Sequence, residues 1–488
     1  MEGSSEKTQE VIISSRATVM QATPTPPHKR HLFLSCFDLI WAKHHYNQRL
    51  LFYEAFATSS HPAAVAIAKL KSSLALCLDH YYPWCGRLMH GEPPHVRPFI
   101  DCNDAGVEFV EASLDLPIWQ LSSCGFQMQP FFEKLCQRVD PSAQESPLLS
   151  IQATLFSDGG LSLGISHSHV VGDGQAFWNF MISWSECARE LPLSLPPLLD
   201  REILAVPNPS PEKATWKFNA TMREEDMMDP GGNSSQDPNP DLSTTVRTPP
   251  CLAQCLFILP FSAVKQLKLE DGGVHTSYEV ICAHIWKHVS VARQRPSYEP
   301  THFSVLANCR SRLKPPLPSS YFGNAIWGDM TMTTTGKICG ESLHDIASRI
   351  HDTVVAIVQD SLVGFMNWVE LPENNLASAI DPHTPKGGAI LVASSPRFPV
   401  YNVDYGWGKP SAVRSPKVPG NGEVVLFGGN PKLEEGDVEC CVCLSKDAIK
   451  RLLDDSKFLG KAPSNPLLQI KWGDNVCSLN AAVAPTLV

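Results

Sequence analysis

The chain has 488 residues, of which 43% are hydrophobic and 18% charged, and its formal net charge is −10. This length exceeds what one ordinary hydrophobic core accommodates and predicts two to three domains, while the apolar content excludes a globally disordered chain. The acidic balance and the lack of a Lys/Arg-rich stripe argue against nucleic acid or an anionic membrane surface as a partner.

The first 30 residues place Glu2, Glu6 and Glu10 among Ser and Thr. They lack the basic start and apolar stretch of a secretory signal, and no later run of 18 apolar residues predicts a membrane span. The 16 cysteines are scattered and are expected to be reduced thiols. We therefore expect a cytoplasmic protein, and we interpret residues 1–30 as a mobile N-terminal lead-in.

Residues 31–206 are predicted to form a first globular domain. The segment 62–79 is rich in Ala, Leu and Lys, lacks Gly and Pro, and predicts a helix. Residues 149–156 and 161–169 are β-prone runs joined by an Asp-Gly-Gly turn, which predicts a β-hairpin.

After Asp173-Gly174 the hydrophobic period changes from that of a strand to that of a helix. Apolar side chains then recur at i, i+3, i+4 and i+7, at Phe177, Phe180, Met181 and Trp184. This spacing places them on one helix face. The simplest role for Asp173 is therefore the N-cap of that helix, with Gly174 relieving strain at its entry.

Residues 207–250 are the clearest break in composition, with a core of Gly, Asn, Ser, Asp and Pro that has almost nothing to bury. We predict a crossover linker there and a second domain over residues 251–488. Within it, Thr276 and Glu279 have the spacing of a capping box before a helix at 280–293, and a closing helix is expected near 446–455.

His169 is the sharpest candidate for chemistry because it ends a predicted strand just before Asp173-Gly174. A histidine there can project into a cleft, and its ordinary pKa suits general-base work; Asp173 is placed to orient it or to hold the loop. Strand periodicity puts His167 on the same face, so spacing alone leaves two candidate bases. A His-x-His zinc site is a rival interpretation, with Asp173 as the one local candidate for a further ligand.

Other motifs carry less chemistry. The run Cys440-Cys441-Val-Cys443 contains C-x-x-C, but no second pair or nearby histidine completes a zinc site, so a buried strand is the better interpretation. The chain has neither G-x-G-x-x-G after a strand nor G-x-x-x-x-G-K, which argues against nicotinamide and nucleotide chemistry.

The segment Asp404-Tyr-Gly-Trp-Gly408 places two glycines around a tryptophan, which indicates an unusual turn. A buried carboxylate generally needs a cation beside it. The candidate partners for Asp173 or Asp404 are Arg310, Arg312 and Arg397.

Together these motifs resemble those of the plant BAHD acyltransferases over essentially the whole chain. The segment His169-x-x-x-Asp173-Gly174 is similar to the family's H-x-x-x-D-G, and Asp404-Tyr-Gly-Trp-Gly408 to its D-F-G-W-G, with Tyr405 in place of Phe. Three supporting segments follow the family's order: Tyr82-Pro-Trp-Cys-Gly-Arg87, Arg310-Ser-Arg312-Leu-Lys-Pro-Pro-Leu-Pro and Tyr321-Phe-Gly-Asn324.

The resemblance implies an α/β fold with mixed sheets, in which two similar chloramphenicol-acetyltransferase-like domains enclose an active-site channel at their interface. It implies that His169 deprotonates the acceptor for attack on an acyl-CoA thioester, without a covalent acyl-enzyme and without a metal. Acyl-CoA is then a co-substrate, the acceptor is a small molecule and no cofactor is permanently bound. The analogy also implies a monomer.

Further roles follow from the resemblance. Asp173 is expected to turn away from His169 and to pair with an arginine, Arg310 in preference to Arg312. The reaction's oxyanion needs a donor, and the Trp407 indole N–H is one candidate. Structural support is expected from Gly174, Asp404, Gly406 and Gly408, and substrate contacts from Ser35, Asp38, Ser277, Asn324 and Arg397.

Residues 395–401 are most similar to the flavonoid and anthocyanin glucoside acyltransferases. Gln175, where malonyl-transferring members often have a basic residue, favours an aromatic acyl donor. We therefore expect transfer of a hydroxycinnamoyl or other aromatic acyl group to a hydroxyl of a phenolic or flavonoid glycoside. Arg397 also matches an arginine that holds the acceptor carboxylate in the shikimate branch, so a shikimate or quinate acceptor stays open. Malonyl transfer, hydrolysis of acyl-CoA by a thioesterase and ligand binding by an inactive homologue stay open as well.

Overall fold

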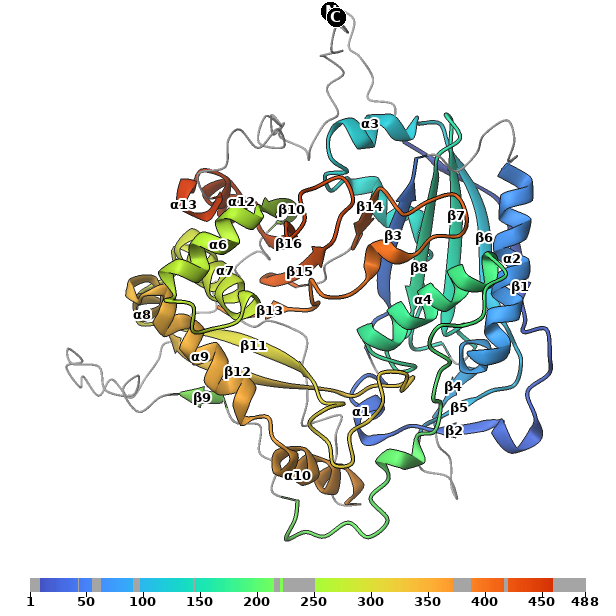
Figure 1. The fold of residues 1–488 in the computed structure, drawn as a ribbon, viewed down its shortest axis with the longest axis horizontal. Helices are drawn as coiled ribbons and strands as arrows, with labels where there is room; N and C mark the ends of the chain where they lie inside the picture. The colour runs from blue at the N-terminus through green and yellow to red at the C-terminus, as the bar shows by residue number, and fades with distance from the viewer. Residues whose placement is uncertain are drawn as a thin grey trace, which may run out of the picture.

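The computed structural model describes residues 9–42, 44–54, 63–90, 97–143, 145–214, 220–222, 251–371, 388–416 and 420–459. These residues form a mixed α/β fold with two large mixed sheets, one to the right and one to the left in Figure 1. Among the described helices, none has both the length and the hydrophobicity of a membrane span. The described cysteines are free thiols.

The first sheet is built mainly from the N-terminal half. Its strand order is β1 (Val11–Val19), β6 (Val107–Leu114), β7 (Leu149–Phe156), β8 (Leu161–His167), β3 (Asn47–Tyr53) and β14 (Ala412–Arg414). Helices α2 (Ala63–His80) and α4 (Gly174–Ala188) lie together against it (Figure 1). The Trp184 indole N–H joins the two helices by donating to the Leu70 carbonyl at 3.2 Å.

Shorter elements complete this half. A small sheet has the order β2 (His31–Phe33), β5 (Phe99–Asp101) and β4 (Arg87–Met89). The short helices are η1 (Pro27–Lys29), α1 (Cys36–Leu39), η2 (Tyr82–Cys85), α3 (Ile118–Ser123), η3 (Pro130–Leu135) and η4 (Glu202–Leu204).

The second sheet has the strand order β10 (Leu252–Leu259), β16 (Val438–Ser445), β15 (Glu423–Gly428), β13 (Ile390–Val392), β11 (Pro300–Asn308), β12 (Ile326–Thr334) and β9 (Ala220–Met222). The helical elements of this half are α6 (Phe261–Glu270), α7 (Ser277–Arg293), α8 (Thr335–Gly340), α9 (Leu343–Ala356), α10 (Gln359–Glu370), η5 (Val400–Asn402), α12 (Lys446–Leu453) and α13 (Ser456–Leu459).

The two halves share their cores through β15 and β16. Along β16, Cys440 and Val442 pack in the core beneath α7, whereas Cys441 and Cys443 join the core of the first sheet. Successive strand residues point to opposite faces, and a strand buried on both faces reads as a continuous apolar run. The cysteine-rich segment is therefore a buried strand, as predicted.

Several local predictions are confirmed. The helix expected at 62–79 is α2, the hairpin is β7 and β8, and the closing helix is α12. Thr276 and Glu279 form a complete capping box at the start of α7. The four apolar residues of the predicted helix face after Asp173-Gly174 are all buried on α4.

Three boundary predictions are corrected. Residues 11–19 of the supposed mobile lead-in form β1, whose β-prone residues pair antiparallel with β6. Residues 220–222 of the supposed linker form β9 and pair with β12, while most of 207–250 lies outside the described residues. The segment 251–488 is not a separate domain throughout, because β14 pairs with β3 and so extends the first sheet.

Candidate active site

The loop from the end of β8 to the start of α4 carries the candidate base. His167 is the last residue of β8, and the backbone N–H of Ser168 donates to the Leu148 carbonyl at 2.9 Å. Asp173 has an extended backbone, and its carboxylate accepts from the Ala176 N–H at 3.0 Å. Asp173 is thus the N-cap of α4, and this bond satisfies one of the free N–H groups at the helix start.

Asp173 is joined to the second half of the chain by a buried, two-point ion pair. Arg310 Nη1 lies 2.7 Å from Asp173 Oδ2, and Arg310 Nη2 lies 3.0 Å from Oδ1. The Ala325 N–H donates to the same Oδ2 at 3.0 Å. Arg312 instead donates to backbone carbonyls at the end of α9. The preference for Arg310 over Arg312 is therefore correct, and the Asp173 carboxylate is committed to structure.

A second buried ion pair lies beside the first. Arg201 Nε is 2.9 Å from Asp38 Oδ2, and Asn324 donates to Asp38 Oδ1 from its backbone N–H and from Nδ2, at 2.9 and 2.8 Å. Ser35 donates to Oδ2 from its N–H and hydroxyl, in the capping box of α1. Ser35 and Asp38 are both buried and both oxygens of Asp38 are occupied, so the described contacts give them a structural role; that they contact substrate stays a prediction.

Both arginines also hold the segment 321–324 against the loop that follows β8. Arg201 donates from Nη2 to the Val171 carbonyl at 2.7 Å and from Nη1 to the Phe322 carbonyl. Arg310 Nη2 donates to the carbonyls of the two residues that flank Phe322. A Cβ at Gly323 would lie 2.5 Å from Arg201 Nη1, so only glycine fits there. Two motifs far apart in sequence are thereby fixed as one unit.

His169 lies on this unit and is 8% exposed. Asn324 Nδ2, which also binds Asp38, donates to the His169 backbone carbonyl at 2.9 Å. The indole of Trp41 is stacked on the imidazole, with ring centroids 3.6 Å apart and an interplanar angle of 11°, and His44 meets both rings edge-on.

Burial lowers the pKa of His169 to about 4, although the nearby charge of Asp173 opposes this shift. Burial favours the neutral form of an imidazole because it removes water from the charged form. The His169 side chain is therefore uncharged at physiological pH, which is the protonation state that a general base requires.

His167, the rival candidate, belongs to the core of the first half. Its imidazole is stacked on the Phe177 ring, with centroids 4.0 Å apart and planes at 8°, and it meets Trp84 edge-on. It is 3% exposed, and burial holds its pKa well below the ordinary value. His167 therefore packs against α4, whereas His169 contacts Trp41 and Asn324. The zinc interpretation loses its third ligand, because Asp173 is bound to Arg310.

The Asp404–Gly408 segment is a turn closed by its own aspartate. Asp404 Oδ1 accepts from the N–H groups of Gly406 and Gly408 at 2.8 and 2.9 Å. These glycines have φ values of +107° and +101°, in the region that favours glycine. The Asp404 Oδ1 atom is therefore bonded to the backbone of its own turn, and this contact is structural.

Trp407 lies at the wrong end of the first sheet to act as an oxyanion donor. Its ring meets Tyr53 edge-on, at 6.3 Å between centroids. Tyr53 pairs with Leu161 at the first residue of β8, whereas His167 is the last. Six residues of strand span about 20 Å, so the indole lies far from the His169 end of β8. The described geometry argues against this candidate role.

The remaining predicted residues differ in their placement. A Cβ at Gly174 would lie 2.9 Å from the Phe398 ring, so glycine lets residues 395–400 approach the start of α4. Arg397, next to Phe398, is exposed and sits at this approach. Ser277 is the exposed first residue of α7, and no described contact joins it to His169.

Two site residues have no clear signal in the sequence. Arg201 forms the ion pair with Asp38. A buried carboxylate generally needs a cation, but this rule alone does not say which arginine supplies it. Trp41 covers His169, but it follows Asp38 in an apolar stretch and has no spacing that distinguishes it from a core residue. Its role becomes visible only in three dimensions.

Comparison with known proteins agrees with this architecture. The model of the Transferase family matches residues 9–459. Hydroxycinnamoyltransferase of Narcissus pseudonarcissus is 31% identical over 406 residues, covering 82% of this chain and 89% of its own. Shikimate O-hydroxycinnamoyltransferase of Nicotiana tabacum is 30% identical over 351 residues, covering 70% and 77%. The crystal structure of vinorine synthase superposes with a TM-score of 0.67 at 20% identity, covering 92% of this chain and 100% of that one.

Proposed function

Because the chain belongs to the Transferase family, that of the BAHD acyltransferases, we propose that it moves an acyl group from acyl-CoA to a hydroxyl. We propose His169 as the general base of this reaction. The observation that carries this proposal is the placement of a neutral, buried imidazole on the unit that joins the two halves. The family uses acyl-CoA as co-substrate, and the chain is an acyl-CoA-dependent acyltransferase.

In the proposed reaction, the acceptor O–H transfers its proton to the uncharged His169 imidazole as its oxygen attacks the thioester carbonyl carbon. The tetrahedral intermediate then collapses, the C–S bond breaks, and the CoA sulfur receives the proton from the imidazolium. No covalent bond to the protein forms. Asp173 and Arg310 hold the loop, and Asn324 fixes the His169 backbone through its carbonyl; these are positioning residues.

We propose a hydroxycinnamoyl or other aromatic acyl donor. The residue that follows Asp173-Gly174 is the neutral Gln175, whose side chain bonds to Asn308 and to the Ser319 carbonyl. The nearby Arg201 and Arg310 are occupied by buried carboxylates. Gln175, Arg201 and Arg310 therefore offer no free cation to a malonyl carboxylate, which favours an uncharged acyl chain. The names of the relatives agree with an aromatic donor.

For the acceptor, the motifs at 395–401 favour a hydroxyl of a phenolic or flavonoid glycoside. A second candidate is a small hydroxy acid such as shikimate or quinate, because the exposed Arg397 stands beside the Phe398 contact with Gly174 and a guanidinium binds carboxylates well. A relative named for shikimate supports this second candidate.

A thiol-release assay with coumaroyl-CoA, malonyl-CoA and acetyl-CoA, each with a phenolic glycoside, shikimate or no acceptor, tests the proposal. We expect acceptor-dependent release that is fastest with coumaroyl-CoA, and a coumaroyl ester in the mass spectrum. Release that is equally fast without any acceptor would replace transferase by thioesterase. A shikimate ester that is lost in Arg397→Gln would select the second acceptor.

We also propose a monomer, because one chain supplies both partners of each ion pair at the site. Size-exclusion chromatography with light scattering tests it, and a stable dimer would contradict it. The cytoplasmic location stays a prediction.

A further inference from the structure

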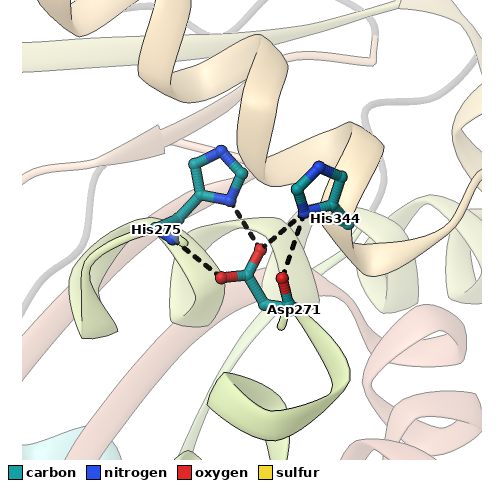
Figure 2. A group of neighbouring side chains, drawn as sticks. All are labelled: Asp271, His275 and His344. Atoms are coloured by element: carbon teal, nitrogen blue, oxygen red, sulfur yellow. Dashed lines mark hydrogen bonds and ion pairs between the residues drawn. The ribbon is translucent and has the colours of Figure 1, made fainter. Parts of the chain in front are cut away.

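Three side chains of the types that can bind a metal converge around the helix junctions of the second half. Asp271 is the C-cap of α6, His275 precedes the N-cap of α7, and His344 lies in the first turn of α9. Their ligand atoms all lie within 4.8 Å of one another. Figure 2 shows both imidazoles turned toward the Asp271 carboxylate.

The convergence is on one oxygen atom. His275 Nδ1 lies 2.5 Å and His344 Nδ1 lies 3.2 Å from Asp271 Oδ1 (Figure 2). His344 Nδ1 is also 3.1 Å from the Asp271 backbone carbonyl. Two nitrogens and one carboxylate oxygen, with a backbone oxygen beside them, form a mixed N/O set, which suits zinc and other divalent transition metals.

The surroundings hold two of these ligands in place. The His275 backbone N–H donates to Asp271 Oδ2 at 2.8 Å, and His275 Nε2 lies 3.2 Å from the Ser348 hydroxyl. Metal-binding histidines usually bond their second ring nitrogen in this way, which fixes the ring. Asp271 and His275 are buried, whereas the His344 side chain is 45% exposed. The group is therefore rigid on one side and open to solvent on the other.

We propose that Asp271, His275 and His344 bind a divalent transition-metal ion of the Zn²⁺ class, through Asp271 Oδ1 and the two Nδ1 atoms, with water in the fourth position. Bonds of about 2.0–2.1 Å in tetrahedral geometry place ligand atoms about 3.3 Å apart. The His344 pair already has this separation, and His275 and Asp271 need to separate by less than about 1 Å. Each imidazole must give up the proton that it shares with the carboxylate.

Neighbouring groups do not compete for the same oxygen. Lys268 Nζ lies 4.0 Å from Asp271 Oδ2, the oxygen that faces away from the two histidine rings. His351 stands 5.5 Å from the His275 ring, but its Nδ1 is bonded to Glu279 at 2.9 Å. The ordinary interpretation is that the triad is a set of hydrogen bonds that fastens the loop between α6 and α7 to α9. A metal would occupy the same place and strengthen the same connection.

The site belongs to the second half and shares no residue with the unit around His169. The proposed role is therefore structural: metal binding to the folded chain alone adds to its stability. His344→Gln removes one ligand at an exposed position, and Asp271→Asn removes the charge. His351→Gln is the matched control, because it removes a neighbouring histidine with a similar exposed fraction but leaves the triad intact.

Chelator-treated full-length protein is titrated with Zn²⁺ by calorimetry and with Co²⁺ by visible spectroscopy. We expect one site per chain and four-coordinate Co²⁺ bands without the thiolate-to-cobalt charge-transfer band that bound cysteine would give. His344→Gln should weaken binding at least about tenfold, because even outer-shell partners are worth about 10- to 100-fold, and Asp271→Asn should weaken it further.

Zn²⁺ should raise the melting temperature of wild type and His351→Gln but not of His344→Gln, while acyl transfer stays unchanged in all three proteins. Absence of stoichiometric Zn²⁺ binding to the wild type would overturn the proposal, as would a thiolate band in the Co²⁺ spectrum. Equal affinity in wild type and His344→Gln would overturn it too, and an equal loss in His351→Gln would overturn the assignment of the three ligands.

Discussion

Asp173 and Arg310 meet across the boundary between the two halves, with both carboxylate oxygens of Asp173 engaged by the guanidinium at 2.7 and 3.0 Å. Both side chains are almost completely buried. The aspartate of the H-x-x-x-D-G motif therefore fixes the loop that carries His169 instead of sharing a proton with its imidazole. This relationship leads to the first prediction.

Arg310→Ala is expected to lower the free energy of unfolding by about 3–5 kcal/mol, because it leaves Asp173 as a buried charge without its partner. Urea unfolding at neutral pH measures this loss. Arg312→Ala is the matched control: the described bonds of the Arg312 side chain are to carbonyls, so its loss should be about 1–2 kcal/mol. Equal losses in the two variants would contradict the assigned ion pair.

Trp41→Ala should move the acid limb of the kcat/KM profile to higher pH. The stacked indole contributes to the burial that holds the pKa of His169 at about 4, and water in its place favours the imidazolium. A base must be unprotonated, so activity falls when the pH drops below its pKa, and this fall should begin at a higher pH in the variant. Trp41→Phe retains an aromatic cover and should shift the limb less. A limb that moves to lower pH in Trp41→Ala would contradict the account.

Stability should fall as the pH is lowered from about 6.5 toward 4. Burial lowers the pKa of His169 and His284 to about 4 and holds that of His167 well below its ordinary value, so the unfolded chain binds protons in this window that the folded chain does not. Acid therefore favours unfolding. Once the pH is below both the folded-state and the unfolded-state pKa, the loss is about 3 kcal/mol each for His169 and His284. Urea midpoints at pH 7.5 and 5 measure this, and His284→Gln should flatten the dependence. A midpoint independent of pH would contradict it.

Trp407→Phe should retain a kcat close to that of the wild type, because the indole lies at the far end of β8. Loss of an oxyanion donor would instead cost about 10²–10³-fold. Gly406→Ala should lower stability by about 1–3 kcal/mol, since φ of +107° is strained for alanine. Parallel kcat measurements and melting curves test both variants. A hundredfold lower kcat in well-folded Trp407→Phe would restore the catalytic role.

Local structure could be predicted where interactions between residues close together in the sequence determine it. The α4 face, the capping box at Thr276 and the N-cap at Asp173 depend on residues a few positions apart, and the structure contains all three. His169 and Arg310 could be predicted because the motifs that contain them occur in the same order as in a known family.

The rest depends on contacts between distant segments. Strands β1 and β14 form the two edges of the first sheet although they are far apart in the chain, and the residues of a strand carry no signal for the sheet that it will join. The family resemblance assigns Asp38 a substrate contact, and the sequence does not show that Arg201 and Asn324 occupy both of its oxygens. Trp41 and Asn324 are far from His169 in the sequence and reach it only through tertiary packing.

The most direct test is the acceptor-dependent release of CoA by His169→Gln beside His167→Gln, with melting curves of both proteins. The account predicts that His169→Gln unfolds cooperatively near the wild-type temperature but loses about 10²–10⁴-fold in kcat, the usual contribution of a general base. His167→Gln should mainly lose stability, because its ring packs on Phe177. Near-wild-type turnover in folded His169→Gln would contradict the central claim.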